Sequence, residues 1–281
     1  RLRAAGFNRI YVDVWNNGVV YHRSATIERF AGAAAVGPDL LALALRLAKP
    51  LGFEVWAWYE YGVMASHESS TTRAFPAEVL RRQAQGSNWV AGRADGFVWM
   101  RVDNSGVRQV VGSMMADGVR NYPQLDGVQL DDHAACPRGL LGCSVANVRR
   151  ALNEFVAAAR GARPSIGTSL SPYPLSGSVY KYNVDWVAMA RDGLFDEYVP
   201  QEYTTMNAGD FTERVGRNQR DVPAAAQSRL VMGVRCSPKE RPTSWASLSA
   251  MLDTTATANY GVAVWFSQCV DMYEASLKAK W

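Results

Sequence analysis

Hydrophobic and polar positions follow two different rhythms along this chain. Short runs rich in β-branched and aromatic residues have the period typical of strands, and they begin near Ile10, Phe53, Gly127, Ile166, Glu197, Leu230 and Gly261. Stretches with helical spacing lie between them, at residues 38–49, 76–85, 105–121, 145–159, 184–192 and 244–258. In the third of these, Ser105 is a candidate cap for the helix. The alternation predicts an α/β fold made of βα units around a parallel sheet.

The number of strands predicts which fold of this class the chain adopts. Seven predicted strands are one fewer than a closed (β/α)8 TIM barrel contains. Residues 1–8 have the pattern of a helix end that runs into a strand. We therefore expect a TIM barrel whose first strand lies before Arg1 and is missing from this chain. No linker or low-complexity tract interrupts the series, so residues 1–281 are predicted to form a single domain.

Composition and charge exclude several classes of function. The 30 basic and 26 acidic residues give a net charge of +4, and the basic residues are spread along the chain, which argues against a nucleic-acid-binding protein. No apolar stretch approaches the roughly 18 residues of a membrane span. The three histidines, His22, His67 and His133, have none of the spacings typical of metal sites. We expect no metal ion and no cofactor.

The four cysteines leave the redox state open. Cys136 and Cys143 flank a short loop containing proline and glycine that would allow a disulfide, although free buried thiols are an equal alternative. Cys236 and Cys269 each follow an apolar run, where they would either pair or pack as thiols. Neither pair has the spacing of a zinc site.

Strand phase indicates which polar residues share a cavity. The helices of a parallel barrel cover its outer face, so polar strand residues point inward or lie at the strand ends. With a period of two, Asp13 points inward on the first run, and Glu60 points inward at the end of the second. Gln129 fixes the phase of the third run, so that Asp131 points inward and Asp132 lies at the rim.

Carboxyl groups at neighbouring strand ends are suited to cleaving an acetal. One carboxyl must stay protonated to donate to the leaving oxygen, while another stays ionised. Glu60, Asp131 and Asp132 are therefore the candidate catalytic residues. In the alternative interpretation, the two aspartates cap the following loop or pair with Arg101 or Arg138. For Asp13, which lies deeper, we expect a structural hydrogen bond.

Aromatic and polar side chains near the strand ends fit a carbohydrate ligand. Flat rings stack on the apolar face of a sugar, whereas polar groups bind its hydroxyl, acetamido or carboxylate groups. Trp56 is expected in the core, and the strand phase leaves the role of Glu202 open. His133 is expected to orient an aspartate or bind a hydroxyl. The candidate substrate-binding residues are Trp15, Asn16, Trp58, Tyr61, His133, Tyr173, Gln201, Glu202, Tyr203, Arg235 and Trp265.

Five segments together resemble a known family. Residues 11–18, 57–62, 126–133, 169–174 and 196–203 occur in the order and with the spacing seen in the glycosyl-hydrolase-like 10 family, and the similarity extends to about Trp265. The resemblance implies a TIM barrel related to glycoside hydrolases, usually exported, that acts on or recognises polysaccharide. It also places Asp131 and Glu60 at acidic positions typical of the family. The sequence departs from the family at Tyr173, where relatives often carry Asn, and at Glu202, which replaces an apolar residue.

These observations support one leading function and one competitor. We expect an extracytoplasmic or secreted glycoside hydrolase that cleaves polysaccharide without a metal ion, with Asp131 as principal carboxylate and Asp132 or Glu60 as its partner. Adjacent aspartates also allow a route assisted by a substrate acetamido group. The competitor is a carbohydrate-binding or surface-assembly barrel without activity. A nucleotide- or phosphate-using barrel is poorly supported, because the sequence contains neither a P-loop nor a GxGxxG motif after a strand.

Overall fold

The computed structural model describes residues 1–202, 208–236, 243–265 and 267–280. They form two compact units. The larger unit consists of Arg9–Ser169 and Gly177–Asp185, and the smaller unit consists of Arg1–Asn8, Leu170–Ser176 and Trp186–Trp281. The single domain and the closed barrel stay predictions.

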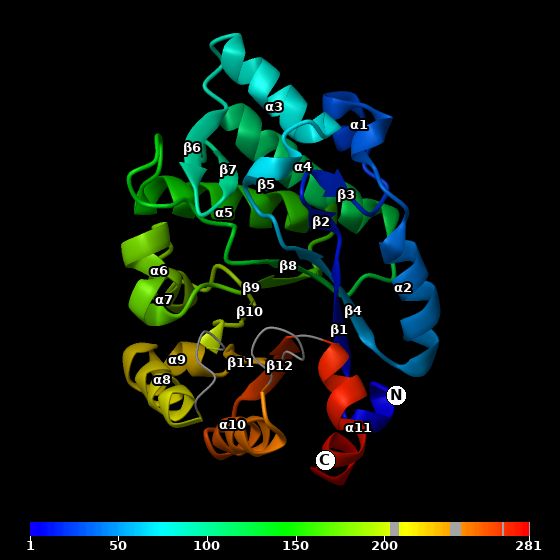
Figure 1. Ribbon diagram of the computed structural model, residues 1–281, viewed down its shortest axis with the longest axis vertical. Coiled ribbons are helices and arrows are strands. Elements are labelled where there is room, and N and C mark those ends of the chain that lie inside the picture. The colour runs from blue at the N-terminus through cyan, green and yellow to red at the C-terminus, as the bar shows by residue number, and fades with distance from the viewer. Residues whose placement is uncertain (203–207, 237–242, 266, 281) are drawn as a thin grey trace. The chain divides into compact units, whose positions relative to one another are not determined.

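A parallel sheet forms the centre of the larger unit. Its strands are β1 (Arg9–Asp13), β4 (Glu54–Tyr59), β8 (Gly127–Leu130) and β9 (Gly167–Leu170), in the order β1-β4-β8-β9 (Figure 1). β1 pairs with β4 and β4 with β8 in parallel, and the register places Asp13 opposite Trp58 and Trp58 opposite Gln129. The predicted α/β class with a parallel sheet is therefore confirmed.

The two faces of this sheet follow the predicted period of two. On one face, the rings of Tyr11 and Trp56 pack with their centroids 6.0 Å apart. A Cβ atom on Gly127 would lie 2.3 Å from the Trp56 ring, so glycine leaves the space that the indole fills. On the opposite face, the buried Tyr59 hydroxyl lies 3.1 Å from Nε2 of His22. Trp56 is thus a core residue, as predicted.

Helices between the strands match most of the predicted segments. In the larger unit these are α2 (Leu40–Ala48), α3 (Ala74–Ala84), α4 (Ser105–Asn121) and α5 (Val145–Ala162), while α1 (Ala25–Ala31) and α6 (Leu175–Tyr182) were not predicted. α4 packs against α5, where Arg108 Nε lies 2.8 Å from Glu154 Oε2. The cap of α4 is Asn104, whose side chain accepts from the backbone of Gly106 and Val107, and not Ser105.

Two antiparallel additions follow the ends of β1 and β4, and neither was predicted. β2 (Trp15–Asn16) and β3 (Val19–Val20) form a hairpin whose turn residues Asn17 and Gly18 have φ of 49° and 75°. β5 (Met64–His67), β7 (Phe97–Met100) and β6 (Val90–Ala94) form a small sheet in the order β5-β7-β6 (Figure 1). Its turn, Asp95-Gly96, has φ of 54° and 81°. Both turns use the left-handed pairs typical of tight hairpins.

The smaller unit contains the three remaining predicted strands. They are β10 (Glu197–Tyr198), β11 (Val231–Arg235) and β12 (Gly261–Trp265), and β11 pairs with β12 in parallel. Its helices are α7 (Trp186–Arg191), α8 (Ala208–Asp221), α9 (Ala224–Gln227), α10 (Trp245–Thr257) and α11 (Gln268–Lys280), of which α7 and α10 were predicted. Across both units, no described helix has the length and apolarity needed to cross a bilayer.

All four cysteines are paired. Cys136 is bonded to Cys143 in the larger unit, and Cys236 is bonded to Cys269 in the smaller unit, each with a Cα–Cα distance of 5.3 Å. The second bond joins the residue after β11 to the start of α11. The disulfide alternative therefore holds for both pairs.

Candidate active site

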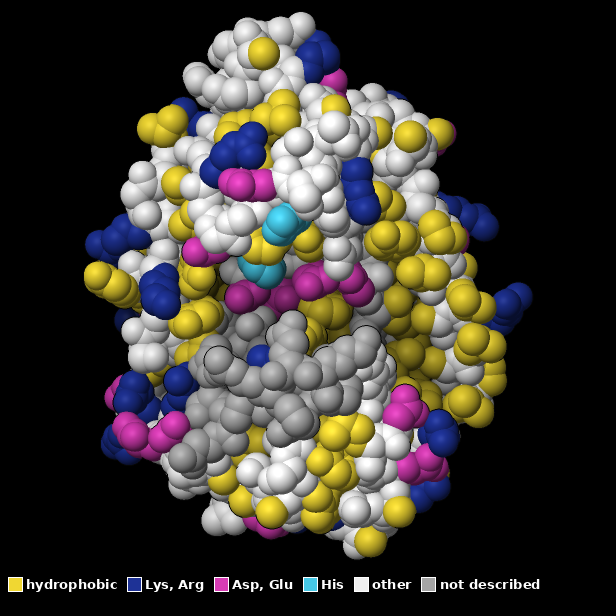
Figure 2. Space-filling model, viewed as in Figure 1, with side chains coloured by type: hydrophobic (Ala, Val, Ile, Leu, Met, Phe, Trp, Pro, Cys, Tyr) yellow, Lys and Arg dark blue, Asp and Glu magenta, His cyan; other side chains and the backbone are white. Residues whose placement is uncertain are grey.

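Acidic residues gather at the carboxyl ends of β1, β4 and β8 in the larger unit. Asp13 ends β1, Glu60 follows β4, and Asp131 and Asp132 follow β8. Because Trp58 lies opposite both Asp13 and Gln129, the next residues on that face are Glu60 and Asp131. Both aspartates act electrostatically on Glu60. Figure 2 shows acidic side chains gathered beside histidine side chains on this face of the molecule.

Asp13 and Glu60 form a contact between two carboxyl groups. Their side chains lie within hydrogen-bonding reach of each other, and each carboxyl group acts on the pKa of the other. Asn16, from the hairpin strand β2, donates from Nδ2 to Oδ2 of Asp13 over 2.7 Å and also to Oε2 of Glu60. Two carboxyl groups can share a hydrogen bond only when one of them holds a proton.

The surroundings favour a proton on Glu60. Burial raises the pKa of Glu60 to about 9, and the nearby Asp13, Asp131 and Asp132 carboxyl groups act in the same direction. Burial also raises the pKa of Asp13, against the hydrogen bonds from Glu60 and Asn16, which lower it. At neutral pH the proton of the pair therefore lies on Glu60.

His133 connects the ends of β4 and β8. Its Nδ1 lies 3.1 Å from the Glu60 carbonyl oxygen and 3.3 Å from Oδ1 of Asp132. The predicted role of His133 in orienting an aspartate thus falls on Asp132. Of the arginines that sequence offered as alternative partners, Arg101 pairs with Asp103 over 2.6 Å, and Arg138 lies over the Tyr180 ring.

Three side chains after β8 have donor atoms close together. The carboxylates of Asp131 and Asp132 and a ring nitrogen of His133 lie within 4.8 Å of one another. This spacing is also compatible with a divalent cation. Since Nδ1 of His133 faces two oxygen atoms, Glu60 O and Asp132 Oδ1, we assign the group a hydrogen-bonding role, and the chelation experiment below tests that assignment.

The segments after β4 and β8 touch through their backbones. Val63 N donates to the His133 carbonyl over 3.0 Å. Gly62 has φ of +44°, and a Cβ atom there would lie 2.4 Å from the His133 carbonyl and from the Ala134 nitrogen. The positive φ and the lack of space for a Cβ atom both require glycine at position 62.

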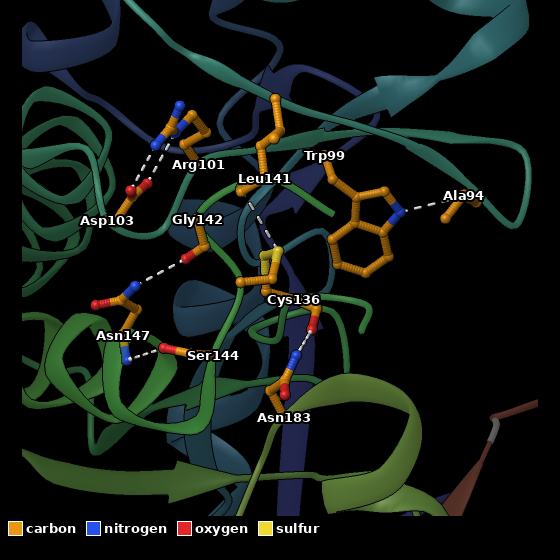
Figure 3. Close-up of a disulfide and its surroundings, with 11 residues drawn as sticks. Ala94, Trp99, Arg101, Asp103, Cys136, Leu141, Gly142, Ser144, Asn147 and Asn183 are labelled. Atoms are coloured by element: carbon orange, nitrogen blue, oxygen red, sulfur yellow. Dashed lines mark hydrogen bonds and ion pairs between the residues drawn. A yellow bond between two sulfur atoms is a disulfide. The ribbon is translucent and has the colours of Figure 1, made fainter. Parts of the chain in front are cut away.

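A disulfide closes the loop that follows the acidic residues (Figure 3). Cys136 is buried and its carbonyl accepts from Asn183 Nδ2 over 2.8 Å. On the other side of the loop, Asn147 Nδ2 donates to the Gly142 carbonyl over 3.0 Å. The disulfide and these amide contacts fix the course of the chain directly after Asp131, Asp132 and His133.

The structure does not support the predicted stacking role of Trp15. Its side chain is fully buried, its ring packs edge-on against Phe75, and its Nε1 donates to the Gly62 carbonyl over 3.2 Å. Trp15 is therefore part of the core. The sequence reasoning continued the strand period past Asp13, whereas the chain leaves β1 there and enters the hairpin.

Other aromatic residues surround His133. Tyr61 contacts it with ring centroids 6.2 Å apart, and Phe97 and Trp99 of β7 contact it at 5.5 and 6.0 Å. Burial raises the pKa of the Tyr61 hydroxyl to about 12. Trp58 is half-buried, and its Nε1 has no hydrogen-bond partner among the described residues. The sequence reasoning missed Phe97 and Trp99, although Asp95-Gly96 before them signals a hairpin.

The remaining candidates lie in the smaller unit. Nε2 of Gln201 lies 3.3 Å from the Ser171 hydroxyl. Arg235 lies opposite Trp265 in the β11–β12 pair, with its guanidinium 5.4 Å from the indole ring. Tyr173 is half-buried, and Tyr203 lies outside the described residues. Their roles as substrate ligands stay predictions.

Glu202 has a structural environment in the smaller unit. It is 1% exposed, accepts from Asn218 Nδ2 of α8 over 2.8 Å, and lies 3.6 Å from Arg214. Burial raises the pKa of Glu202, while Asn218, Arg214 and Arg217 lower it. These contacts anchor α8. They replace the contact with substrate that was predicted for Glu202.

Solved structures with this fold are glycosidases by description. The cyclic α-maltosyl-(1→6)-maltose hydrolase of Arthrobacter globiformis is 12% identical with a TM-score of 0.56, over 94% of this chain and 62% of that chain. A debranching enzyme of Nostoc punctiforme is 12% identical with a TM-score of 0.54, over 94% of this chain and 60% of that one. The α-galactosidase of Geobacillus stearothermophilus is 12% identical with a TM-score of 0.60, over 99% of this chain and 37% of that one.

This chain spans about three fifths of the length of the first two of these enzymes. Similarity at such low identity establishes the fold and not the reaction. Together with the parallel sheet, it defines a protein with a glycoside-hydrolase-related fold.

The family follows from the sequence. Residues 1–142 match the family model described as glycosyl hydrolase-like 10, and the chain belongs to this family. No curated protein matches the chain in sequence. The match includes Asp13, Glu60, Asp131 and Asp132.

Proposed function

We propose that the protein is a glycoside hydrolase that cleaves a polysaccharide by acid/base catalysis with carboxyl groups and without a metal ion. The observation that supports it best is the Glu60 carboxyl, which burial and three acidic neighbours keep protonated at neutral pH. Hydrolysis of an acetal needs such a proton donor next to an ionised carboxylate.

Each acidic residue has a separate role in this proposal. Glu60 donates its proton to the glycosidic oxygen as the bond from that oxygen to the anomeric carbon breaks. Asp131 either bonds to the anomeric carbon or takes a proton from the attacking water. Asp132, held by Nδ1 of His133, accepts a hydrogen bond from a substrate hydroxyl or acetamido group.

The proposal includes a binding groove and a location. The half-buried ring of Trp58 would stack on a sugar ring. Tyr61, Tyr173, Gln201, Tyr203, Arg235 and Trp265 stay predicted substrate ligands. Two disulfides favour an oxidising location, because such bonds persist mainly in exported proteins. We therefore propose that the enzyme works outside the cytoplasm.

The test is a panel of purified polysaccharides incubated with the protein, with new reducing ends as the readout. We expect turnover on at least one polysaccharide, and its loss in Asp131→Asn while binding is retained. Glu54→Gln is the matched control, since Glu54 lies at the other end of β4 in an ion pair with Arg9. Glycan binding that is unchanged in Asp131→Asn, with no reducing ends from any polysaccharide, would instead identify a non-catalytic binding barrel.

Chelation tests the absence of a metal. Turnover is expected to be unchanged after dialysis against EDTA. Protonated Glu60 supplies the acid, so no metal ion is needed as a Lewis acid. Activity that disappears with EDTA and returns with a divalent cation would contradict this part of the proposal and assign the cation to Asp131, Asp132 and His133.

A further inference from the structure

We propose that Asp13 and Asn16 are positioning residues for the proton on Glu60. Asp13 shares this proton through a hydrogen bond between the two carboxyl groups, and Asn16 holds both groups in contact. The role of Glu60 as an acid rests on the proposed function, but the sharing of the proton does not depend on any substrate.

The backbone brings the three residues together. Asp13 is paired with Trp58 at the end of β1, and the next residue, Val14, donates to the Trp58 carbonyl over 2.9 Å. Tyr61 N then donates to the Trp15 carbonyl over 3.1 Å. These two bonds lie on either side of Glu60 in the sequence, so the start of the β2–β3 hairpin is fixed against the end of β4.

The hydrogen bonds of the three side chains form a matched set. The Asn16 amide has two N–H donors, and it gives one bond to each carboxyl group. Oδ1 of Asp13 is buried and accepts no N–H or hydroxyl bond within the described part of the chain. A carboxylic proton is the donor that can still satisfy a buried acceptor here, and Glu60 supplies it.

The charges around the pair oppose a second ionisation. Asp131 and Asp132 face Glu60 from the segment after β8, and the Tyr61 hydroxyl, itself near Arg73, is also close. His133 contacts the Glu60 carbonyl and not its carboxyl group. In the described residues, no basic side chain forms an ion pair with Asp13 or Glu60. The pair therefore keeps one proton.

The experiment is a carbon-13 NMR titration of the side-chain carboxyl carbons in the full chain. Glu60→Gln and Asp13→Asn identify the two signals by their loss. In the unaltered protein, the two signals are expected to titrate as a coupled pair, with the upper step on Glu60 far above the range of a free glutamate.

Two variants are expected to shift the titration in opposite ways. Asp13→Asn removes the neighbouring negative charge, so the Glu60 midpoint should fall by at least about one pH unit. Asn16→Ala removes a donor that favours ionised Asp13, so the midpoint of the lower step should rise. Glu54→Gln, on the same strand, is expected to leave both steps unchanged. A residue that only supports the fold would not produce paired shifts of opposite sign.

A Glu60 midpoint that stays unchanged in folded Asp13→Asn would overturn the proposal. Thermal unfolding shows whether each variant is folded. If Asp13→Asn is unfolded, the proposal is refuted instead by an Asn16→Ala variant in which the midpoint of the lower titration step is unchanged. The titration needs no substrate. Expected shifts combined with a negative polysaccharide panel would therefore reject the hydrolase and leave the shared proton in place.

Discussion

Each unit contains a glutamate whose pKa is raised by burial, half-buried Glu60 in one and fully buried Glu202 in the other, and the two sites differ in their neighbours. Glu60 in the larger unit faces the carboxyl groups of Asp13, Asp131 and Asp132, which all raise its pKa in addition to burial. Glu202 in the smaller unit faces Asn218, Arg214 and Arg217, which all lower its pKa against the effect of burial. Burial alone thus does not define an acid catalyst. The sign of the surrounding charge distinguishes the two sites, since the neighbours of Glu60 add to the effect of burial on its pKa and those of Glu202 oppose it.

The largest expected effect tests this difference directly. Glu60→Gln removes the proton donor, so turnover on a responsive polysaccharide should fall by about 10²- to 10⁴-fold. Glu202→Gln keeps the shape of a side chain that has a structural role beside α8, so it should change turnover by less than about tenfold. Initial rates of reducing-end release measure both. Equal losses in the two variants would show that Glu202 also takes part in the reaction.

The disulfides extend the comparison to the stability of each unit. Cys236 and Cys269 are 33 residues apart and Cys136 and Cys143 only 7. In the chain-entropy model, replacing Cys236 and Cys269 by Ala should lower the free energy of unfolding by about 4 kcal/mol. Replacing Cys136 and Cys143 should lower it by about 2.5 kcal/mol. Urea unfolding of the two double variants measures the free energies. If replacing Cys136 and Cys143 lowers the free energy of unfolding more than replacing the other pair, the loop between Cys136 and Cys143 is ordered mainly by its disulfide.

Removing the anchor in the smaller unit should have a moderate effect. Glu202→Ala removes the carboxylate acceptor of the buried Asn218 amide and leaves it only the weak acceptor Met232 Sδ at 3.7 Å, at a cost of about 1–3 kcal/mol in the free energy of unfolding. Glu213→Ala is the matched control, because its exposed i,i+4 pair with Arg217 on α8 should contribute less than about 0.5 kcal/mol. If the two variants lose the same stability, the contacts of Glu202 do not hold α8.

A further expected effect is a bell-shaped dependence of stability on pH. The pKa of Glu60 is raised to about 9, so the folded state binds more protons than the unfolded chain above pH 4.5, and stability falls as pH rises towards 9. Burial lowers the pKa of His22, so the unfolded chain binds more protons below about pH 6.5, and stability falls as pH drops below it.

Melting temperatures across this pH range measure both slopes. Glu60→Gln should flatten the alkaline slope and leave the acid slope intact. His22→Gln should do the reverse, with Tyr59→Phe as the control, because it removes the hydroxyl next to His22 but no titrating group in this range. An alkaline slope unchanged in Glu60→Gln would contradict a proton held on that residue.

Strand phase was enough to predict part of the site. A period of two placed Asp13, Trp58 and Gln129 on one face, and the register of the sheet confirms it. The positions of Glu60 and Asp131 follow from the same rule. Local side-chain alternation fixes these positions, so no knowledge of distant contacts was needed.

The parts that sequence did not predict depend on turns and on contacts distant in sequence. Asn17-Gly18 forms the turn of the hairpin in which Trp15 is buried, and Asp95-Gly96 forms the turn of the hairpin that brings Phe97 to His133. Both dipeptides are hairpin signals that were available in the sequence. The bond from Asn16 to Glu60 spans 44 residues, and only the paired strands reveal it.

Gly62 limits how this scaffold can be redesigned. Because the segments after β4 and β8 meet there without room for a methyl group, neither can be exchanged alone without displacing the other. A segment grafted after β4 is therefore expected to fit only where it keeps glycine at position 62. The two segments form one cassette, and variation in specificity would have to be introduced into both at once.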